Sequence, residues 1–272
     1  GSEMCIRDRH FISVVGIFRM KNPVVVVGIG EMGSVFARGF LRLGHPVYPV
    51  VRGIEMTEVA NRVAEPELAV IAVAEKDIQD VLQAVPESWR DRLVLLQNEL
   101  LPNDWIKHDF DPTVISVWFE KKKGMDSKVI IPSPVFGKHA QQVADALNSI
   151  DIATSVLGSA EDLLFELVLK NVYILTTNIS GLETGGTVGE LWSDHREVAT
   201  QVANEIIQLQ QKLTGQSLDA EQLIEAMVNA FNGDPEHGCM GRSAPARLER
   251  ALMLADEHGL DLPRLKQIAS TL

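Results

Sequence analysis

Lys170 is the charged residue best placed to do chemistry, because it lies in the middle of an apolar helical segment, residues 162–182. At about 100° per residue, Thr177 projects within about 20° of Lys170 on a helix. Asn171 and Asn178 form a neighbouring stripe about 80 to 100° away. A buried ammonium loses solvation, so the pKa of Lys170 is expected to fall toward the range useful for proton transfer. Such a lysine can protonate the oxygen of a carbonyl group that receives hydride.

Two ordinary explanations for Lys170 stay open at this point. Its side chain could extend along the apolar surface until the ammonium reaches water, or it could pair with Glu166 one helical turn earlier. The sequence weighs these explanations equally with a role in proton transfer.

The second chemical feature is a glycine-rich turn that matches the pattern G-x-G-x-x-G directly after a β-branched run. The six residues of the turn are Gly28, Ile29, Gly30, Glu31, Met32 and Gly33. In this context the first glycine permits a tight turn, the second lets a pyrophosphate approach, and the third allows helix and strand to pack closely. Phosphate charge would then rest on the free N–H groups of the following helix. The turn therefore predicts a dinucleotide site.

The end of the second strand indicates which dinucleotide binds. An acidic residue there would contact the ribose hydroxyls of NAD, but this strand ends in VVRG, with Arg52 about 20 residues beyond the glycine turn. Arg52 could hold a 2′-phosphate with two hydrogen bonds, which favours NADP over NAD. Lys76, just past the third strand, is a further candidate for phosphate contact, with an exposed lysine as the alternative.

The elements that must position these residues form an alternating pattern. Apolar strands are expected at residues 24–27, 47–51, 69–73 and 93–96, with helical stretches between them, and further strands at 114–119 and 128–131. The PSP sequence at residues 132–134 is interpreted as a break before a helix near 138–149. This pattern predicts an α/β fold, with an N-terminal Rossmann domain that contains a doubly wound parallel sheet.

From Glu161 onward the strand-like clusters disappear and long helical patterns follow, which predicts an all-helical C-terminal domain. We expect a Rossmann NADP-binding domain at residues 21–158 and a helical substrate or dimerisation domain at 159–272. Residues 1–20 are expected to be a leader, artefactual or disordered in part. An apolar helical domain often supplies a dimer surface, so a homodimer stays open.

Composition excludes several classes of function. The 272 residues are 46% hydrophobic and 23% charged, as in a globular protein, and the formal charge of −12 argues against binding to nucleic acid or an anionic membrane. No apolar run reaches the roughly 20 residues of a membrane helix. Two cysteines, Cys5 and Cys239, support neither a disulfide framework nor a metal site, and fit a reducing cytoplasm.

The chain resembles the ketopantoate reductase family from Val24 to Pro263. The matching segments, in order, are VVVVGIGEMGSVFA, VLLQN ending at Asn98, DLLFELVLKN, NISGLETGGTVGEL and HGLDLP. The resemblance implies an NADPH-dependent 2-oxoacid reductase with its active site between a Rossmann domain and a helical domain. Lys170 matches the catalytic lysine of the family, Asn98 an asparagine that positions cofactor and substrate, and Asn178 a substrate-binding asparagine.

The departures from the family concern the substrate. The first helix asparagine of the family is replaced by Ile174, for which Asn171 is a substitute from another angle, and the glycine after Asn98 is replaced by Glu99. The late glutamate of the family has no counterpart. Alignment on HGLDLP places Ser243 there, and alignment on Gly241-Arg242 places Pro245. These changes leave the recognition of ketopantoate, and with it a place in pantothenate biosynthesis, open.

The sequence therefore predicts an NADPH-dependent oxidoreductase that reduces a small 2-oxo acid or a related carbonyl. Lys170 is the predicted general acid. The predicted substrate contacts are Asn98, Asn178, Asn171 and Ser243. Two alternatives stay open: a reductase of imines or 3-oxo acids on the same scaffold, and an NADP-binding sensor without catalysis.

Overall fold

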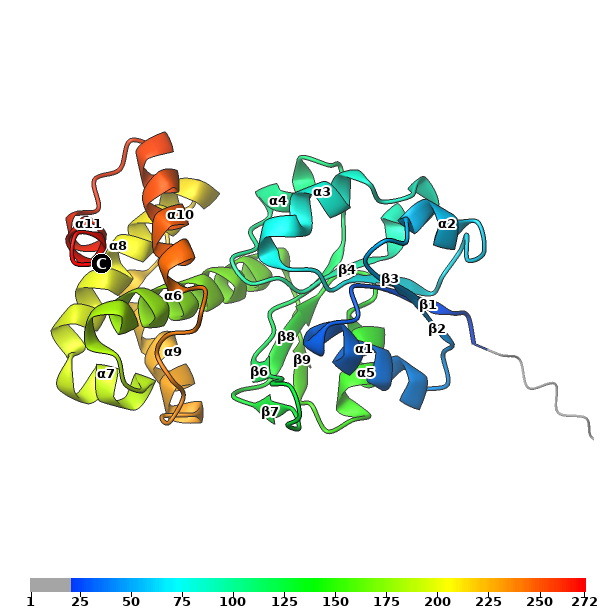
Figure 1. The fold of residues 1–272 in the computed structure, drawn as a ribbon, viewed down its shortest axis with the longest axis horizontal. Coiled ribbons are helices and arrows are strands. Elements are labelled where there is room, and N and C mark those ends of the chain that lie inside the picture. Colours follow the sequence, from blue (N-terminus) through cyan, green and yellow to red (C-terminus); the bar gives the residue numbers. More distant parts are fainter. Residues whose placement is uncertain (1–20) are drawn as a thin grey trace, which may run out of the picture.

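The computed structural model describes residues 21–272, so the expectation of a leader at residues 1–20 lies outside the described residues. Figure 1 shows a sheet covered by helices on both faces, and beside it a cluster of helices. The long helix α6 (Ala160–Thr184) runs from the sheet into this cluster. No helix of the described part has both the length and the apolar character needed to cross a membrane.

The main sheet has seven strands in the order β2-β1-β3-β4-β5-β8-β9. Their bounds are β1 Val24–Val27, β2 Val47–Val50, β3 Leu68–Ile71, β4 Leu93–Leu95, β5 Thr113–Ile115, β8 Ser133–Phe136 and β9 Thr154–Val156. Both neighbours of β1 run parallel to it, and the chain reaches them through helices on opposite faces. The predicted doubly wound fold is confirmed, and β1 lies at the point where ligands bind in such sheets.

The sheet is not parallel throughout, because β8 pairs antiparallel with β5 and parallel with β9. The interpretation of residues 132–134 as a break was therefore wrong. Pro134 lies inside β8, where its carbonyl accepts a hydrogen bond of 2.9 Å from the Ser116 amide. A proline supplies this acceptor as well as any residue does, although it lacks an N–H group. The expected strand at residues 128–131 is instead part of a hairpin of β6 (Phe119–Glu120) and β7 (Lys128–Val129).

Side chains alternate across the sheet and form two cores. Val24 and Val26 face one core and Val25 and Val27 the other, as the twofold period of a strand requires. The first core is covered by α1 (Glu31–Arg42) and α5 (Ala140–Asn148). The other is covered by α2 (Met56–Ala60), α3 (Ile78–Gln83), α4 (Asn103–Ile106) and the short 3₁₀ helices η1 (Glu75–Asp77) and η2 (Glu87–Arg92) (Figure 1).

The helical cluster is built around α6. The remaining helices are α7 (Val188–Asp194), α8 (Arg196–Thr214), α9 (Ala220–Gly233), α10 (Ala244–Glu257) and α11 (Pro263–Ala269). The Ser159 hydroxyl caps α6 by accepting a hydrogen bond from the Asp162 amide, and this start agrees with the expected change of pattern. Leu163 and Leu167 still pack in the core of the sheet, whereas residues from Val168 onward pack in the helical core. Both parts of the molecule therefore share α6.

Candidate active site

The glycine turn lies at the carboxyl end of β1 and has the geometry that a dinucleotide site requires. Gly28 has φ +91°, which a residue with a side chain rarely adopts. A Cβ on Gly33 would lie 1.9 Å from the Gly28 carbonyl oxygen, whereas a Cβ on Gly30 would meet no protein atom within 4 Å. Gly30, the N-cap residue of α1, has no side chain that could cap the helix. The first-turn N–H groups of α1 therefore face open space and fit an incoming phosphate.

The charges around the turn include one residue that the sequence did not indicate. Glu31 begins α1, where a phosphate would bind, and the ammonium of Lys121 lies 3.6 Å from its carboxylate. Lys121 directly follows β6, and its side chain is only 18% exposed. Its position depends on the β6–β7 hairpin, which the sequence pattern did not reveal. Arg52 is exposed just after β2, and Lys76 is exposed in η1.

Lys170 is buried in α6, with 8% of its surface exposed, and its Nζ lies 4.0 Å from the centroid of the Trp118 ring. None of residues 21–272 forms a hydrogen bond or ion pair with Nζ, so the expected alternative of a pair with Glu166 is not seen. Burial, followed by the positive charge of Arg247, lowers the pKa of Lys170 to about 7, and Glu120 opposes this effect. The Trp118 face also favours the ammonium form.

Lys170 faces a cleft of about 430 Å³ between the sheet and the helical cluster. The sheet side supplies Met32 of the glycine turn and Asn98 after β4. The helical side supplies Thr177 and Asn178 of α6. The cleft therefore extends from the glycine turn, where the dinucleotide site begins, to the polar residues of α6.

The three asparagines named from the sequence do not share this cleft. Asn98 and Asn178 line it, whereas Asn171 donates a 2.9 Å hydrogen bond to Gln210 and lines a smaller cavity of about 200 Å³ beside α8. Lys76 lines this smaller cavity as well. Ser243 is exposed at the start of α10 and does not line the cleft. The structure therefore brings together Lys170, Asn98 and Asn178, but neither Asn171 nor Ser243.

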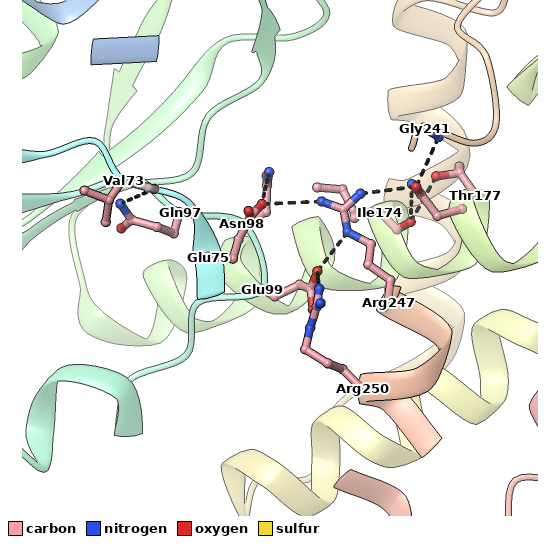
Figure 2. A network of polar contacts seen from close by, with 11 residues as sticks. Val73, Glu75, Gln97, Asn98, Glu99, Ile174, Thr177, Gly241, Arg247 and Arg250 are labelled. Atoms are coloured by element: carbon pink, nitrogen blue, oxygen red, sulfur yellow. Dashed lines mark hydrogen bonds and ion pairs between the residues drawn. The ribbon is translucent and has the colours of Figure 1, made fainter. Parts of the chain in front are cut away.

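A network of ion pairs, which the sequence did not reveal, contributes Asn98, Asn178 and Arg247 to the wall of the cleft, and Figure 2 shows its contacts. Arg247 of α10 donates from Nε to Glu99 at 2.8 Å, from one terminal nitrogen to Asn178 Oδ1 at 3.1 Å, and from the other to Glu75 at 3.4 Å. Arg250 also donates to Glu99, at 2.7 Å. Because Glu75 and Glu99 follow strands β3 and β4, the network connects the sheet to the helical cluster.

The same network determines which side-chain atoms of Asn98 and Asn178 can contact a ligand in the cleft. Asn98 donates from its amide nitrogen to Glu75 at 3.0 Å, so its carbonyl oxygen stays available as an acceptor. Asn178 Oδ1 accepts from Arg247 and from the Gly241 amide, and its Nδ2 donates to the Ile174 carbonyl. One N–H of Asn178 remains available. The cleft therefore offers an amide acceptor and an amide donor in fixed orientations.

Another part of the cleft wall is acidic and aromatic. His237 Nδ1 lies 2.8 Å from the Glu120 carboxylate, and burial lowers the pKa of His237. The buried hydroxyl of Tyr173 has no hydrogen-bond partner among the described residues. Cys239 lies in the wall of the cleft, where burial raises the pKa of its thiol to about 11, so the thiol is protonated.

Glu205 of α8 is neither a surface residue nor part of the cleft wall. Its carboxylate is buried and accepts hydrogen bonds from the Arg264 and Leu265 amides, at 2.8 and 3.0 Å. It therefore caps the N-terminus of α11 from a neighbouring helix. His258 is the C-cap residue of α10 and does not line the cleft, whereas His237 and Cys239 do.

The chain combines a Rossmann-type sheet that carries a glycine turn with a helical part built on the long shared helix α6. These features define its structural class. Its fold is that of the ketopantoate reductases, as the sequence resemblance predicted. The chain is similar to 2-dehydropantoate 2-reductase from Methylococcus capsulatus, with 13% identity, a TM-score of 0.66, and coverage of 92% of this chain and 95% of that one.

Two further solved structures have the same fold. The dimeric ketopantoate reductase from Staphylococcus aureus has 18% identity and a TM-score of 0.63, over 92% of this chain and 96% of that one. A D-mandelate dehydrogenase in complex with NADH has 15% identity and a TM-score of 0.63, over 91% and 96%. No protein-family model matches the sequence, and no curated protein matches it.

Proposed function

We propose that the protein is an NADPH-dependent oxidoreductase that reduces a small 2-oxo acid or a related carbonyl to the corresponding hydroxyl compound. The observation that carries this proposal is the position of Lys170. It is a buried lysine without an ion pair among the described residues, in a cleft that begins at the glycine turn. The structures with this fold include 2-dehydropantoate 2-reductases and a D-mandelate dehydrogenase with NADH, which supports a 2-oxo or 2-hydroxy acid as the substrate.

The chain has the groups that would hold the cofactor. Gly30 and the uncapped first turn of α1 would take the pyrophosphate, and Lys121 would offset the charge of Glu31 beside it. Arg52 would contact the 2′-phosphate of NADPH. A bound nicotinamide cofactor would supply hydride to the carbonyl carbon of the substrate.

Lys170 would supply the proton. Its Nζ in the ammonium form would donate a hydrogen bond to the carbonyl oxygen, stabilise the negative charge that develops there, and then transfer its proton to give the hydroxyl group. With a pKa of about 7, Lys170 can both give up this proton and regain it from water. Asn98 and Asn178, held by the network of ion pairs, would orient the substrate.

The proposal is tested with purified protein, NADPH and a panel of 2-oxo acids, 3-oxo acids and imines, followed by the loss of NADPH absorbance. We expect the fastest turnover with a 2-oxo acid and a loss of about 10²- to 10⁴-fold in Lys170→Ala. Lys123→Ala, at an exposed lysine, should retain full activity. Tight binding of NADPH with no turnover of any compound would favour the alternative of a cofactor-binding protein without catalysis.

The choice of cofactor is tested separately by titration of NADPH and NADH. Arg52→Ala should weaken NADPH binding by about 10-fold or more and leave NADH binding nearly unchanged, because only NADPH carries the 2′-phosphate. A preference for NADH that Arg52→Ala does not alter would contradict the assignment of NADPH.

A further inference from the structure

Arg247 is the only arginine among the described residues that line the cleft. Its side chain is 12% exposed, so the guanidinium is largely removed from bulk water but still reaches the cleft. A guanidinium is the side chain best matched to a carboxylate, because its planar fork can donate two parallel hydrogen bonds.

The protein partners of Arg247 do not use all of its donors. A guanidinium has five N–H donors. Glu99, Asn178 and Glu75 take one each. No described residue accepts from the other two N–H groups, which lie on the terminal nitrogens and can bind a ligand, while the bonds to the protein prevent the side chain from moving away.

The backbone conformation of Glu99 indicates that this residue has a specific role in holding Arg247. Glu99 has φ +60°, in the left-handed region that costs a residue with a side chain about 1–2 kcal/mol. Its carboxylate accepts from both Arg247 and Arg250. A glycine would take this backbone conformation without strain, but it would leave Arg247 without its closest partner.

We propose that Arg247, held in place by Glu99 and Asn178, binds a carboxylate group of the substrate and makes the cleft selective for anionic carbonyl compounds. This inference rests on the proposed reduction of a carbonyl at Lys170. It names the group of the cleft wall that would select the substrate.

A carboxylate at Arg247 would also act on Lys170. Arg247 is the second cause, after burial, of the low pKa of Lys170. A bound carboxylate would offset the charge of Arg247, so Lys170 would hold its proton more firmly when an anionic substrate is present. The substrate would then be bound with the proton donor in its charged form.

The substrate carries this carboxylate either next to the reacting carbonyl or at its far end. Asn178, the partner of Arg247, lies eight residues beyond Lys170 on α6, about 12 Å along the helix axis. The reach of the Lys170 and Arg247 side chains decides whether the carboxylate next to the carbonyl or the one at the far end of the substrate contacts Arg247. Both sources share the same chemistry and can be separated by experiment.

The test measures the binding of three probes by calorimetry in the presence of NADPH: 2-oxobutanoate, 2-oxoglutarate and the uncharged butanone. Arg247→Ala should raise the Kd of at least one carboxylate about 10- to 100-fold and leave that of butanone unchanged. A loss for both acids identifies the carboxylate next to the carbonyl, and a loss for 2-oxoglutarate alone identifies the far one. Arg247→Lys, which keeps a positive partner for Glu99, should recover only part of the affinity.

Arg250→Ala is the matched control, because Arg250 also pairs with Glu99 but does not line the cleft. It should leave the Kd of every probe within about 2-fold of the wild type. Equal Kd values in wild type and Arg247→Ala, equal losses in Arg250→Ala, or a wild type that binds neither acid would each overturn the role of Arg247. Because binding is measured without turnover, a protein that binds these acids but reduces nothing would contradict the proposed function and not this inference.

Discussion

The protonation state of Lys170 sets the pH dependence that we predict for catalysis. Only the ammonium form can protonate the carbonyl oxygen, and its pKa is lowered to about 7 by burial. The kcat/KM for reduction, which reports the free enzyme, should therefore be constant below about pH 7 and fall by up to tenfold per pH unit above it. Oxidation of the hydroxyl compound needs the neutral amine, so its kcat/KM should rise over the same range.

These profiles are measured at substrate concentrations well below KM, in both directions, with wild type and Arg247→Lys. Arg247→Lys keeps a positive charge near Lys170, so the inflection should stay near its original pH. A reduction rate that does not change between about pH 6 and pH 9 would show that Lys170 does not supply the proton.

Glu99 gives a second prediction at the scale of single residues. Glu99→Ala removes the ion pairs with Arg247 and Arg250 and keeps the strain at φ +60°, whereas Glu99→Gly removes both the pairs and the strain. Glu99→Gly should therefore be more stable than Glu99→Ala by about 1 kcal/mol, and both should be less stable than the wild type. Chemical denaturation of the three proteins measures this order. A Glu99→Gly protein more stable than the wild type would show that the ion pairs contribute less than the strain costs.

At the scale of elements, two glycines of the turn between β1 and α1 have different functions. Gly30 leaves room for a ligand, and Gly33 allows the helix and the strand to pack closely. Gly30→Ala places its Cβ in open space, so folding should be unaffected, but the methyl group would occupy the approach of a phosphate. Gly33→Ala places its Cβ 1.9 Å from the Gly28 oxygen, which forces the backbone to move. We expect Gly30→Ala to weaken NADPH binding about 10-fold or more at unchanged Tm, and Gly33→Ala to lose several kcal/mol of stability as well.

Thermal unfolding and cofactor titration of the same two variants separate these effects. Ser34→Ala, on the same helix, serves as the control and should retain both stability and affinity to within about 1 kcal/mol. A large loss of stability in Gly30→Ala would show that protein atoms, and not a ligand, require this glycine.

The elements themselves were largely predictable from the sequence, and the two strands that were missed have separate causes. Strands β1 to β4 have β-branched or leucine-rich apolar runs, and their expected bounds agree with the structure to within two residues. Strand β8 was missed because Pro134 was interpreted as a break, although the pairing there needs only its carbonyl group. Strand β9 (Thr154–Val156) is short and largely exposed, so it has no apolar signature.

At the scale of the whole molecule, local sequence patterns predicted which site residues lie close together only within one element. Lys170 and Asn178 lie on neighbouring stripes of one helix, so their closeness follows from the helical period, whereas Asn98 was identified only through the family resemblance. Arg247 and Glu99 are 148 positions apart, and no local pattern indicates that they meet. The replacement of a glycine by Glu99 was visible in the sequence, but its partner became visible only when α10 was placed against the carboxyl edge of the sheet.

The burial of Lys170 also predicts how the stability of the whole molecule depends on pH. The pKa is about 7 in the folded protein and near 10.5 in the unfolded chain, so between these values the unfolded state binds more protons. Lys170 therefore destabilises the protein most near and below pH 7, and the cost disappears as the pH rises toward 10.5. Lys170→Met removes the buried amine at similar volume, and it should be more stable than the wild type by a few kcal/mol at pH 7.

The difference in unfolding free energy between Lys170→Met and the wild type should shrink by up to about 1.4 kcal/mol per pH unit between about pH 7 and pH 10. Denaturant unfolding of both proteins at several pH values measures it, and the comparison cancels the titration of all other groups. Lys123→Met, at an exposed lysine, should follow the wild type at every pH. A constant difference between Lys170→Met and wild type would mean that Lys170 keeps its proton in the folded protein, and the same result would remove the basis for proton transfer near neutral pH.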